Sequence, residues 1–318
     1  MKKIIQYAGA FFILLGTVQA QSVDTDYKKA TIDRIIQLVN DNYVFPDVAE
    51  TTGKYLLKQL EEGKFSNDST VNLFARSLTT SVQSVNHDKH MRVISASAQS
   101  PFRSVSNNSD AGFKEVKILE GNIGYIDMRL FFPPEIASTA ADEAMKTLAG
   151  VDAIILDLRY NGGGEPEMVQ YLASYFFDKK IHLNSLYYRG TNSTQEFWTV
   201  EVNGKKLPDI PLFILTSKRT FSGAEEFSYD MQTQKRATLI GETTGGGANP
   251  GGVFRINDQL SIFIPTGTAI NPITKTNWEG TGVKPEVDAT ADKALETAIP
   301  LAMEAAKKYS TNKKTKGF

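Results

Sequence analysis

The chain has 318 residues and a mass of 35.1 kDa, and 41% of its residues are hydrophobic, which is enough for one large domain with a smaller companion. Its net charge of -1 and its pI near 6.4 indicate neither a nucleic-acid surface nor binding to an anionic membrane. The absence of cysteine excludes disulfides, thiolate nucleophiles and Cys-ligated zinc or iron–sulfur centres. The imidazoles available for chemistry are those of His87, His90 and His182.

The first twenty residues have the three parts of a secretory signal. Two lysines precede an apolar stretch from Ile4 to Leu15, and Val18-Gln19-Ala20 is a small-residue cleavage site. Because the apolar stretch is shorter than the about 20 residues that span a bilayer, cleavage after Ala20 is favoured over a membrane anchor. No cysteine is present to carry a lipid. We expect an exported protein, periplasmic or secreted, without a membrane span once residues 1–20 are removed.

Residues 21–87 are predicted to form a small helical domain. Apolar residues recur with helical spacing from Thr25 to about Phe74, and Pro46 interrupts the pattern. A third helix is expected from Leu73 to Val85. The apolar faces are most simply core, and this part of the chain shows no catalytic motif.

His90 lies where the helical part gives way to an alternating strand. The segment Val85–Ser95 changes to strand-like alternation after the turn-like Asn86-His87-Asp88. Most histidines are not catalytic, so His90 alone is read more simply as a packed or solvated residue. The segment Gln99–Asp110 is rich in Ser and Asn and is expected to be a loop. It leaves too few residues for an inserted peptide-binding domain.

From Phe113 onward strands and helices alternate. Strands are expected at 124–128, 153–158, 210–215 and 238–241, and helices at 134–148, 166–176, 224–232 and 295–307. Such alternation predicts a mostly parallel sheet with functional loops after the carboxyl ends of its strands. This core is expected to occupy 88–308, and the basic tail at 309–318 is expected to be disordered.

One serine stands between a predicted strand and a predicted helix. Ser222, in the octapeptide TFSGAEEF, would be exposed by the turn beside N–H groups that favour an anion. Serine is also a preferred N-cap, and Glu225 lies three residues on. The octapeptide alone therefore fits a helix-capping box as well as a nucleophile.

Two glycine-rich loops follow other predicted strands, at 162–164 and 241–252. A nucleotide-binding interpretation fails, because Gly247 stands where a phosphate-binding loop needs its lysine and the first loop lacks the GxGxxG spacing. Either close approach of backbone N–H groups to an anion or an ordinary tight turn fits these loops. Glu279 lies on a further glycine turn, WEGTG, where a solvated glutamate is the common case.

An activated serine needs a base within hydrogen-bond reach and a third group that orients the base. Without cysteine, three histidines make a short list of bases. A lysine with a pKa lowered by burial is the alternative, but the loop after Gly241 contains none before Lys275.

Four motifs, in this order and spacing, resemble the tail-specific (C-terminal processing) protease superfamily. They are DLRYNGGG, TSKRTFSGAEEF, GETTGGGANP and WEGTGVKPEV, and the resemblance covers roughly Asp88 to the end of the chain. The superfamily also includes the tricorn protease core and the repeat modules of interphotoreceptor retinoid-binding protein. The resemblance implies an α+β or α/β fold with an N-terminal helical domain and a crotonase-like ββα spiral core. The internal PDZ domain of the tail-specific branch is absent from this chain.

The resemblance also implies a serine endopeptidase site. Ser222 matches the nucleophile, whereas the lysine base of the bacterial tail-specific branch is replaced by Gly247. In the tricorn-like branch the base is the histidine of a DxH motif, here His90, and a late glutamate, here Glu279, completes the relay. Lys89 stands where the tricorn core has a serine.

Backbone N–H groups of Gly223 and of Gly163 or Gly164 are implied as the oxyanion hole, and Asp157 and Arg159 as structural. The expected substrate is a peptide or protein, with no cofactor, metal or nucleic acid. Two alternatives remain: a non-catalytic carrier of apolar ligands such as retinoids or fatty acids, and an ester hydrolase on the same scaffold.

Overall fold

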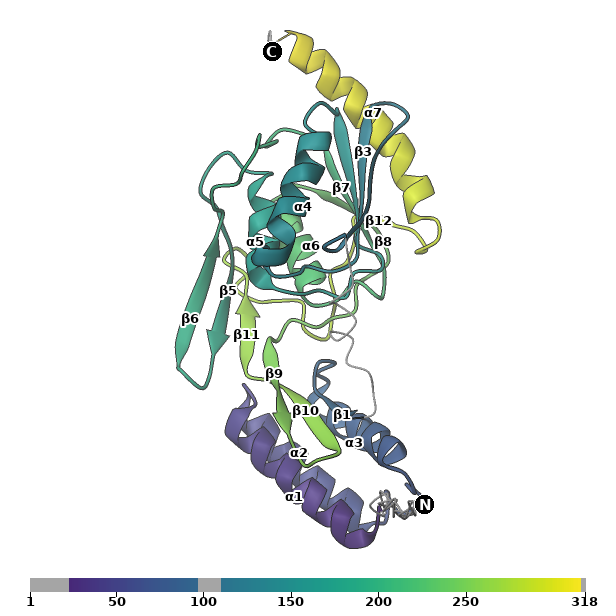
Figure 1. The fold of residues 1–318 in the computed structure, drawn as a ribbon, viewed down its shortest axis with the longest axis vertical. Helices are drawn as coiled ribbons and strands as arrows, with labels where there is room; N and C mark the ends of the chain where they lie inside the picture. The colour runs from purple at the N-terminus through teal and green to yellow at the C-terminus, as the bar shows by residue number, and fades with distance from the viewer. Residues whose placement is uncertain (1–22, 97–109, 316–318) are drawn as a thin grey trace, which may run out of the picture.

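The structure is a computed structural model that describes residues 23–96 and 110–315. The predicted signal at 1–20 lies outside the described residues, as does nearly all of the predicted loop at 99–110. The molecule is elongated, with the N-terminal helices at one end, small sheets at its waist and a large helix-covered sheet at the other end (Figure 1). The first and the last of the described helices, residues 25–42 and 294–315, lie at opposite ends of the molecule (Figure 1).

Three helices form the N-terminal end. They are α1 (Thr25–Asn42), α2 (Pro46–Glu61) and α3 (Val71–Asn86). Asp24 caps α1 by accepting a hydrogen bond from Tyr27 N, and Pro46 begins α2, where its missing N–H costs nothing. At the end of α3, His87 has a φ of 55°, so the chain turns sharply toward Asp88 and His90.

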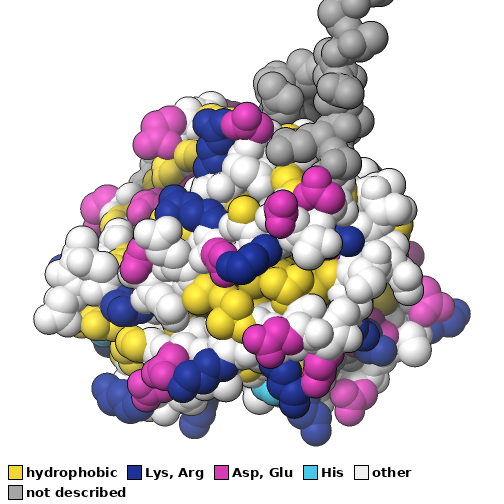
Figure 2. Space-filling view, turned by 90° about the horizontal axis from the view of Figure 1, so that it is seen from below, with side chains coloured by type: hydrophobic (Ala, Val, Ile, Leu, Met, Phe, Trp, Pro, Cys, Tyr) yellow, Lys and Arg dark blue, Asp and Glu magenta, His cyan; other side chains and the backbone are white. Residues whose placement is uncertain are grey.

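The helices share one apolar core with a small antiparallel sheet, ordered β1-β10-β9. Its strands are β1 (Arg92–Ser95), β9 (Gly251–Arg255) and β10 (Leu260–Pro265). Strand β1 therefore joins the N-terminal helices to a hairpin from late in the chain. The outer face of this end shows apolar side chains among charged ones of both signs (Figure 2).

A six-stranded sheet forms the large end, in the order β12-β8-β7-β4-β3-β2. Only the pairing of β2 with β3 is antiparallel, so the predicted mostly parallel sheet is confirmed. The strands are β2 (Phe113–Leu119), β3 (Ile123–Met128), β4 (Ala153–Asp157), β7 (Leu212–Thr216), β8 (Thr238–Gly241) and β12 (Val287–Asp288).

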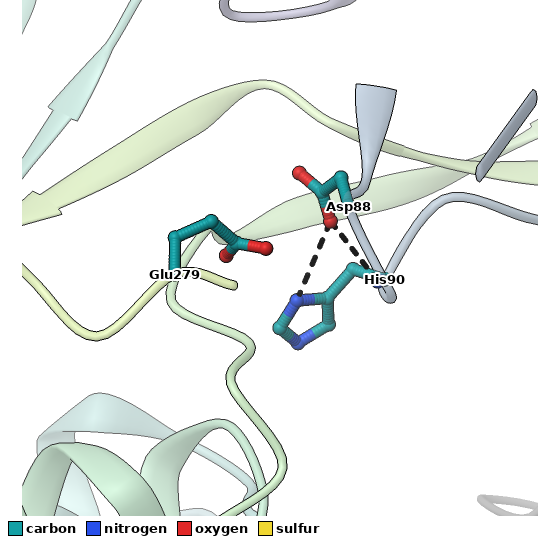
Figure 3. Close-up of side chains that lie close together, drawn as sticks. All are labelled: Asp88, His90 and Glu279. Atoms are coloured by element: carbon teal, nitrogen blue, oxygen red, sulfur yellow. Dashed lines mark hydrogen bonds and ion pairs between the residues drawn. The ribbon is translucent and has the colours of Figure 1, made fainter. Parts of the chain in front are cut away.

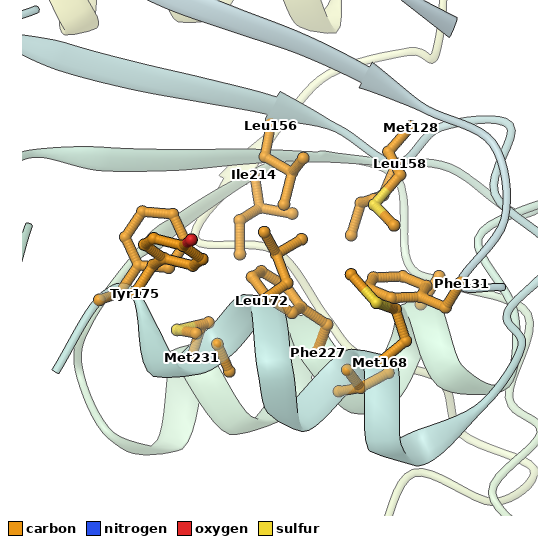
Figure 4. Packing of buried hydrophobic residues seen from close by; sticks show 14 of the residues in the cluster. Met128, Phe131, Leu156, Leu158, Met168, Leu172, Tyr175, Ile214, Phe227 and Met231 are labelled. Carbon is orange, nitrogen blue, oxygen red and sulfur yellow. The ribbon is translucent and has the colours of Figure 1, made fainter. Parts of the chain in front are cut away.

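Helices cover both faces of this sheet (Figure 1). On one face lie α4 (Pro134–Thr147), α5 (Pro166–Ser174) and α6 (Gly223–Thr233), and the apolar residues between them and the sheet are the main core (Figure 4). Alternation along β4 places Leu156 in this core and Ile155 in the opposite one, under α7 (Ala294–Thr315). The predicted fold class, with N-terminal helices followed by a mixed sheet core, is confirmed.

The prediction of a disordered tail at 309–318 is wrong as far as Thr315, because α7 continues to that residue. Tyr309 packs against the main core, and Lys308 pairs with Glu304 one turn earlier. These contacts anchor a segment whose basic composition alone predicts solvation.

A third sheet, ordered β11-β5-β6, lies beside the large one (Figure 1). Its strands are β5 (His182–Tyr188), β6 (Ser193–Trp198) and β11 (Gly267–Ile270). Within the described parts of the chain, no helix has the length and apolar character needed to cross a membrane.

Candidate active site

Ser222 lies in the turn between β7 and α6 with a strained backbone. Its φ of 53° and ψ of -124° fall outside the regions that non-glycine residues readily adopt. A serine that only caps a helix has an extended backbone instead. Ser222 is half-buried and lines a cavity of about 50 Å³ together with Gly164 and Gly223. The strain therefore lies at the edge of a cavity.

Glu225 ties this strained turn to the glycine loop that follows β8. One carboxylate oxygen accepts hydrogen bonds from Ser222 N at 2.9 Å and Gly247 N at 2.8 Å. The other accepts from Gly246 N at 2.6 Å and from the Thr244 hydroxyl. The sequence shows Glu225 as half of a capping box, but nothing in it indicates the three bonds to the loop.

Two of the three predicted oxyanion-hole glycines keep a free N–H. Gly163 N donates to Asn161 Oδ1 at 2.8 Å, so this N–H is not available to an oxyanion. The N–H groups of Gly164 and Gly223 have no acceptor among the described residues and lie close together, since a Cβ on Gly223 would come 3.2 Å from Gly164 N. Glycine at position 163 allows its loop to pack closely on Ser222, because a Cβ there would lie 2.7 Å from Ser222 Cβ.

The structure brings His90 and Glu279 together with Asp88 (Figure 3). His90 Nδ1 lies 3.9 Å from Asp88 Oδ1, and the possible ligand atoms of the three residues all lie within 4.8 Å of one another. His90 Nδ1 and Glu279 Oε1 are buried and have no hydrogen-bond partner among the described residues. The same three residues are close enough to hold a metal ion.

Asp88 and Glu279 are fixed by the loop that follows β8. Asn249 Nδ2 donates to Asp88 Oδ2 at 2.9 Å, and Ala248 N donates to Glu279 at 2.6 Å. Asp88 also accepts from the backbone N of His90 at 3.0 Å, which fixes the turn that carries the imidazole. Sequence reasoning included Asp88 in a DxH motif without giving it a role, and it missed Asn249.

Burial sets the protonation of this group. It lowers the pKa of His90 to about 4, with a further contribution from the charge of Arg92. Burial also raises the pKa of Glu279 to about 7, and the charge of Asp88 adds to this rise. At neutral pH the imidazole is therefore unprotonated and able to accept a proton.

The side chain of Phe221, the residue before the predicted nucleophile, packs against the predicted base. Its ring lies against the His90 imidazole, with centroids 4.6 Å apart, and no hydrogen bond joins Ser222 to that imidazole among the described residues. The glycine loop packs onto both rings, since a Cβ on Gly247 would lie 2.3 Å from Phe221 Cζ and 2.7 Å from His90 Cε1. Lys89 donates from Nζ to Gly245 O, so it holds the same loop.

Comparison with known proteins points to one peptidase family. The model of peptidase family S41 matches residues 122–289, more than half of the chain, and the N-terminal domain of peptidase S41 in eukaryotic IRBP matches residues 26–119. Carboxyl-terminal-processing peptidase 2 of Arabidopsis thaliana chloroplasts is 30% identical over 167 residues, which cover 52% of this chain and 31% of that protein. The chain thus spans about a third of the length of this relative.

Solved structures share the fold. A candidate peptidase of Parabacteroides merdae aligns with a TM-score of 0.62 at 17% identity, covering 86% of this chain and 96% of that chain. Tricorn protease aligns with a TM-score of 0.58 at 15% identity, covering 88% of this chain and 37% of that chain. At these identities the likeness concerns the fold alone.

Proposed function

Because the chain belongs to peptidase family S41, we propose that it is an exported serine endopeptidase that uses Ser222, His90 and Glu279 as a relay. The observation that carries the proposal is the strained backbone of Ser222 beside two free N–H groups, those of Gly164 and Gly223. Helix capping requires no such strain, whereas a nucleophile at a sharp strand-to-helix turn commonly has it.

In the proposed reaction, His90 removes the proton from the Ser222 hydroxyl as its oxygen attacks the scissile carbonyl. The oxyanion that forms accepts hydrogen bonds from Gly164 N and Gly223 N, and each such donor is worth about 10²- to 10³-fold in rate. The imidazolium then gives its proton to the leaving amine. Water attacks the resulting ester with His90 again as base, which releases the acid product and free Ser222.

Asp88 and Glu279 serve this cycle by stabilising the imidazolium. A neutral His90 is favoured in the resting site, because burial opposes its charge. Once the proton is transferred, the imidazolium lies beside two carboxylates, and this attraction exists only after proton transfer. The two acids therefore favour the transition state over the ground state.

We propose that Phe221 moves as the relay assembles. Its ring lies against His90, and catalytic hydrogen bonds are often loose before a substrate binds. We expect a bound peptide to shift this ring and let the imidazole approach Ser222.

The experiment is cleavage of an unfolded protein substrate by purified mature enzyme and its variants. Ser222→Ala and His90→Ala should each lower the rate by about 10³-fold or more. His182→Ala is the matched control, because the His182 ring stacks on Trp198 and does not line the cavity at Ser222, so its loss should leave cleavage within about twofold of wild type. Full activity of Ser222→Ala, with an unchanged thermal unfolding curve, would sink the proposal.

A serine-directed phosphonate separates this proposal from its alternatives. Covalent labelling at Ser222 is expected for a hydrolase and not for a carrier. The cavity at Ser222, about 50 Å³, is far smaller than the about 300 Å³ or more typical of ligand pockets, which argues against a retinoid or fatty-acid carrier at this site. Labelling together with cleavage of esters but of no peptide would favour an ester hydrolase.

Export is part of the proposal and rests on the predicted signal at 1–20. The relevant measurement is the N-terminal sequence of the mature protein, which should begin at Gln21. A mature protein that still begins at Met1 would contradict cleavage.

A further inference from the structure

Glu226 lines the cavity beside Ser222 although its side chain is deeply buried. Only 6% of the residue is exposed. One carboxylate oxygen accepts a hydrogen bond from Asn184 Nδ2 at 3.1 Å, and no described residue donates a hydrogen bond to the other. The walls of the cavity include apolar side chains, those of Pro166, Leu186, Ala248, Pro250 and Trp278. A cationic group that enters the cavity therefore meets one carboxylate, that of Glu226.

The surroundings of Glu226 are acidic. Burial raises the pKa of Tyr188, and the negative charges of nearby glutamates raise it further. Those glutamates are Glu167, Glu226 and Glu165. Asp230, one turn further along α6, is fully buried and has one carboxylate oxygen without a partner. No lysine or arginine in the described parts of the chain forms an ion pair with these acids.

An unneutralised buried carboxylate is costly, and a cation that reaches it removes much of that cost. The cavity thus favours a positively charged group over a neutral one of the same shape. Its apolar walls suit the methylenes of a long side chain, while the ammonium at the end donates to the free oxygen of Glu226.

The size of the cavity selects among cations. At about 10–15 Å³ for each water-sized group, a cavity of about 50 Å³ holds roughly four heavy atoms. Lysine has four heavy atoms beyond Cβ, whereas the guanidinium side chain of arginine has six. Lysine therefore matches the size of the cavity more closely than arginine does.

We propose that Glu226 makes this cavity a specificity pocket for lysine, so that Ser222 attacks the carbonyl of a lysine residue in the substrate. The inference rests on the proposed peptidase function and adds its substrate class. Neither the sequence motifs nor the family comparison assigns Glu226 a role, since its register in the octapeptide indicates only a helix.

The test uses peptides of one sequence that differ only at the residue before the cleaved bond: lysine, norleucine or arginine. Norleucine has the same chain without the charge. With cleavage sites verified by mass spectrometry, kcat/KM for lysine should exceed that for norleucine and for arginine by about tenfold or more. Glu226→Gln should bring the ratio of kcat/KM for the lysine peptide to kcat/KM for the norleucine peptide close to one. Glu143→Gln, the same change on the exposed surface of α4, should leave the ratio at the wild-type value.

Each ratio is measured on one preparation, so the fraction of folded enzyme cancels. Cleavage after norleucine as fast as after lysine overturns the inference, as does a ratio that Glu226→Gln leaves unchanged. If Glu226→Gln does not fold, the ratio of kcat/KM for lysine to that for norleucine in wild-type enzyme tests the inference by itself. Failure of the peptidase proposal gives a different result from failure of the lysine pocket alone: wild-type enzyme would cleave none of the peptides, and Ser222 would not react with the phosphonate. That result overturns both the peptidase proposal and the lysine pocket.

Discussion

Glu225 and Glu226 are adjacent, similarly buried glutamates, and we predict that the same substitution affects stability in opposite directions at the two positions. Glu225 accepts four hydrogen bonds, two at each oxygen. Glu226 accepts one, from Asn184. Replacement by a neutral glutamine therefore removes much hydrogen-bond stabilisation at position 225 and little at position 226.

The magnitudes follow from these bonds. In Glu225→Gln the new amide group faces two donors, so two bonds to a charged acceptor are lost, at about 1.5–3 kcal/mol each. Removal of a buried charge offsets part of this, which leaves a destabilisation of at least about 2 kcal/mol. At Glu226, burial raises the pKa from 4.5 to about 7, so at pH 8 the ionised side chain costs about 3 kcal/mol. Glu226→Gln should recover part of that cost.

The sign of the pH dependence follows from the raised pKa of Glu226. Its contribution to stability is complete below pH 4.5 and is lost as the pH rises through about 7. The advantage of Glu226→Gln over wild type should therefore be present at pH 8 and absent near pH 5. Because the charge of Glu226 also raises the pKa of the buried Asp230, the difference between the two proteins reports Glu226 together with its effect on Asp230.

The assay is urea unfolding followed by circular dichroism at pH 8 and pH 5, with midpoints compared among the two variants, wild type and Glu143→Gln. At pH 8 the expected order of midpoints is Glu226→Gln highest and Glu225→Gln lowest. A midpoint for Glu225→Gln equal to or above that of Glu226→Gln at pH 8 would refute the reasoning from bond partners.

Two further predictions concern the relay. Gly247→Ala places a Cβ against Phe221 and His90, so it should lower kcat by about tenfold or more while far-UV circular dichroism stays unchanged; normal kcat would mean that the loop yields freely. Because Glu279 must be ionised and burial raises its pKa to about 7, kcat/KM for the uncharged norleucine peptide should fall as pH drops through about 7, and Glu279→Gln should remove this limb from the pH profile. A limb that persists in Glu279→Gln belongs to another group.

The parts of the fold with strong local patterns are predictable from the sequence. The strand expected at 238–241 is found there, and the helix expected at 134–148 differs from α4 by one residue. Of the strands in the two small sheets, the sequence predicted the one within Val85–Ser95, found as β1, and the other five strands were not predicted. The pairing of β1 with β10, which joins Val93 to Ile262, depends on contacts between segments far apart in the sequence.

In the site, too, some features could be predicted from the sequence and others could not. Motif order identifies Ser222, His90 and Glu279 as a group, and the structure places the last two near each other. Which backbone N–H groups remain free was not predictable, because Gly163 and Gly164 are adjacent glycines in one motif. Only the position of Asn161 Oδ1 shows that the N–H of Gly163 is already bonded.

The capping-box signature at Ser222 illustrates how one local motif can have two consequences. Glu225 does accept a hydrogen bond from Ser222 N, as such a box requires. Yet the backbone of Ser222 is strained rather than extended, so the box does not serve an ordinary cap. The same carboxylate binds the N–H groups of Gly246 and Gly247, whose loop packs against His90. The feature that argues for a structural serine is therefore the one that holds Ser222 and the loop beside His90 in a fixed relation.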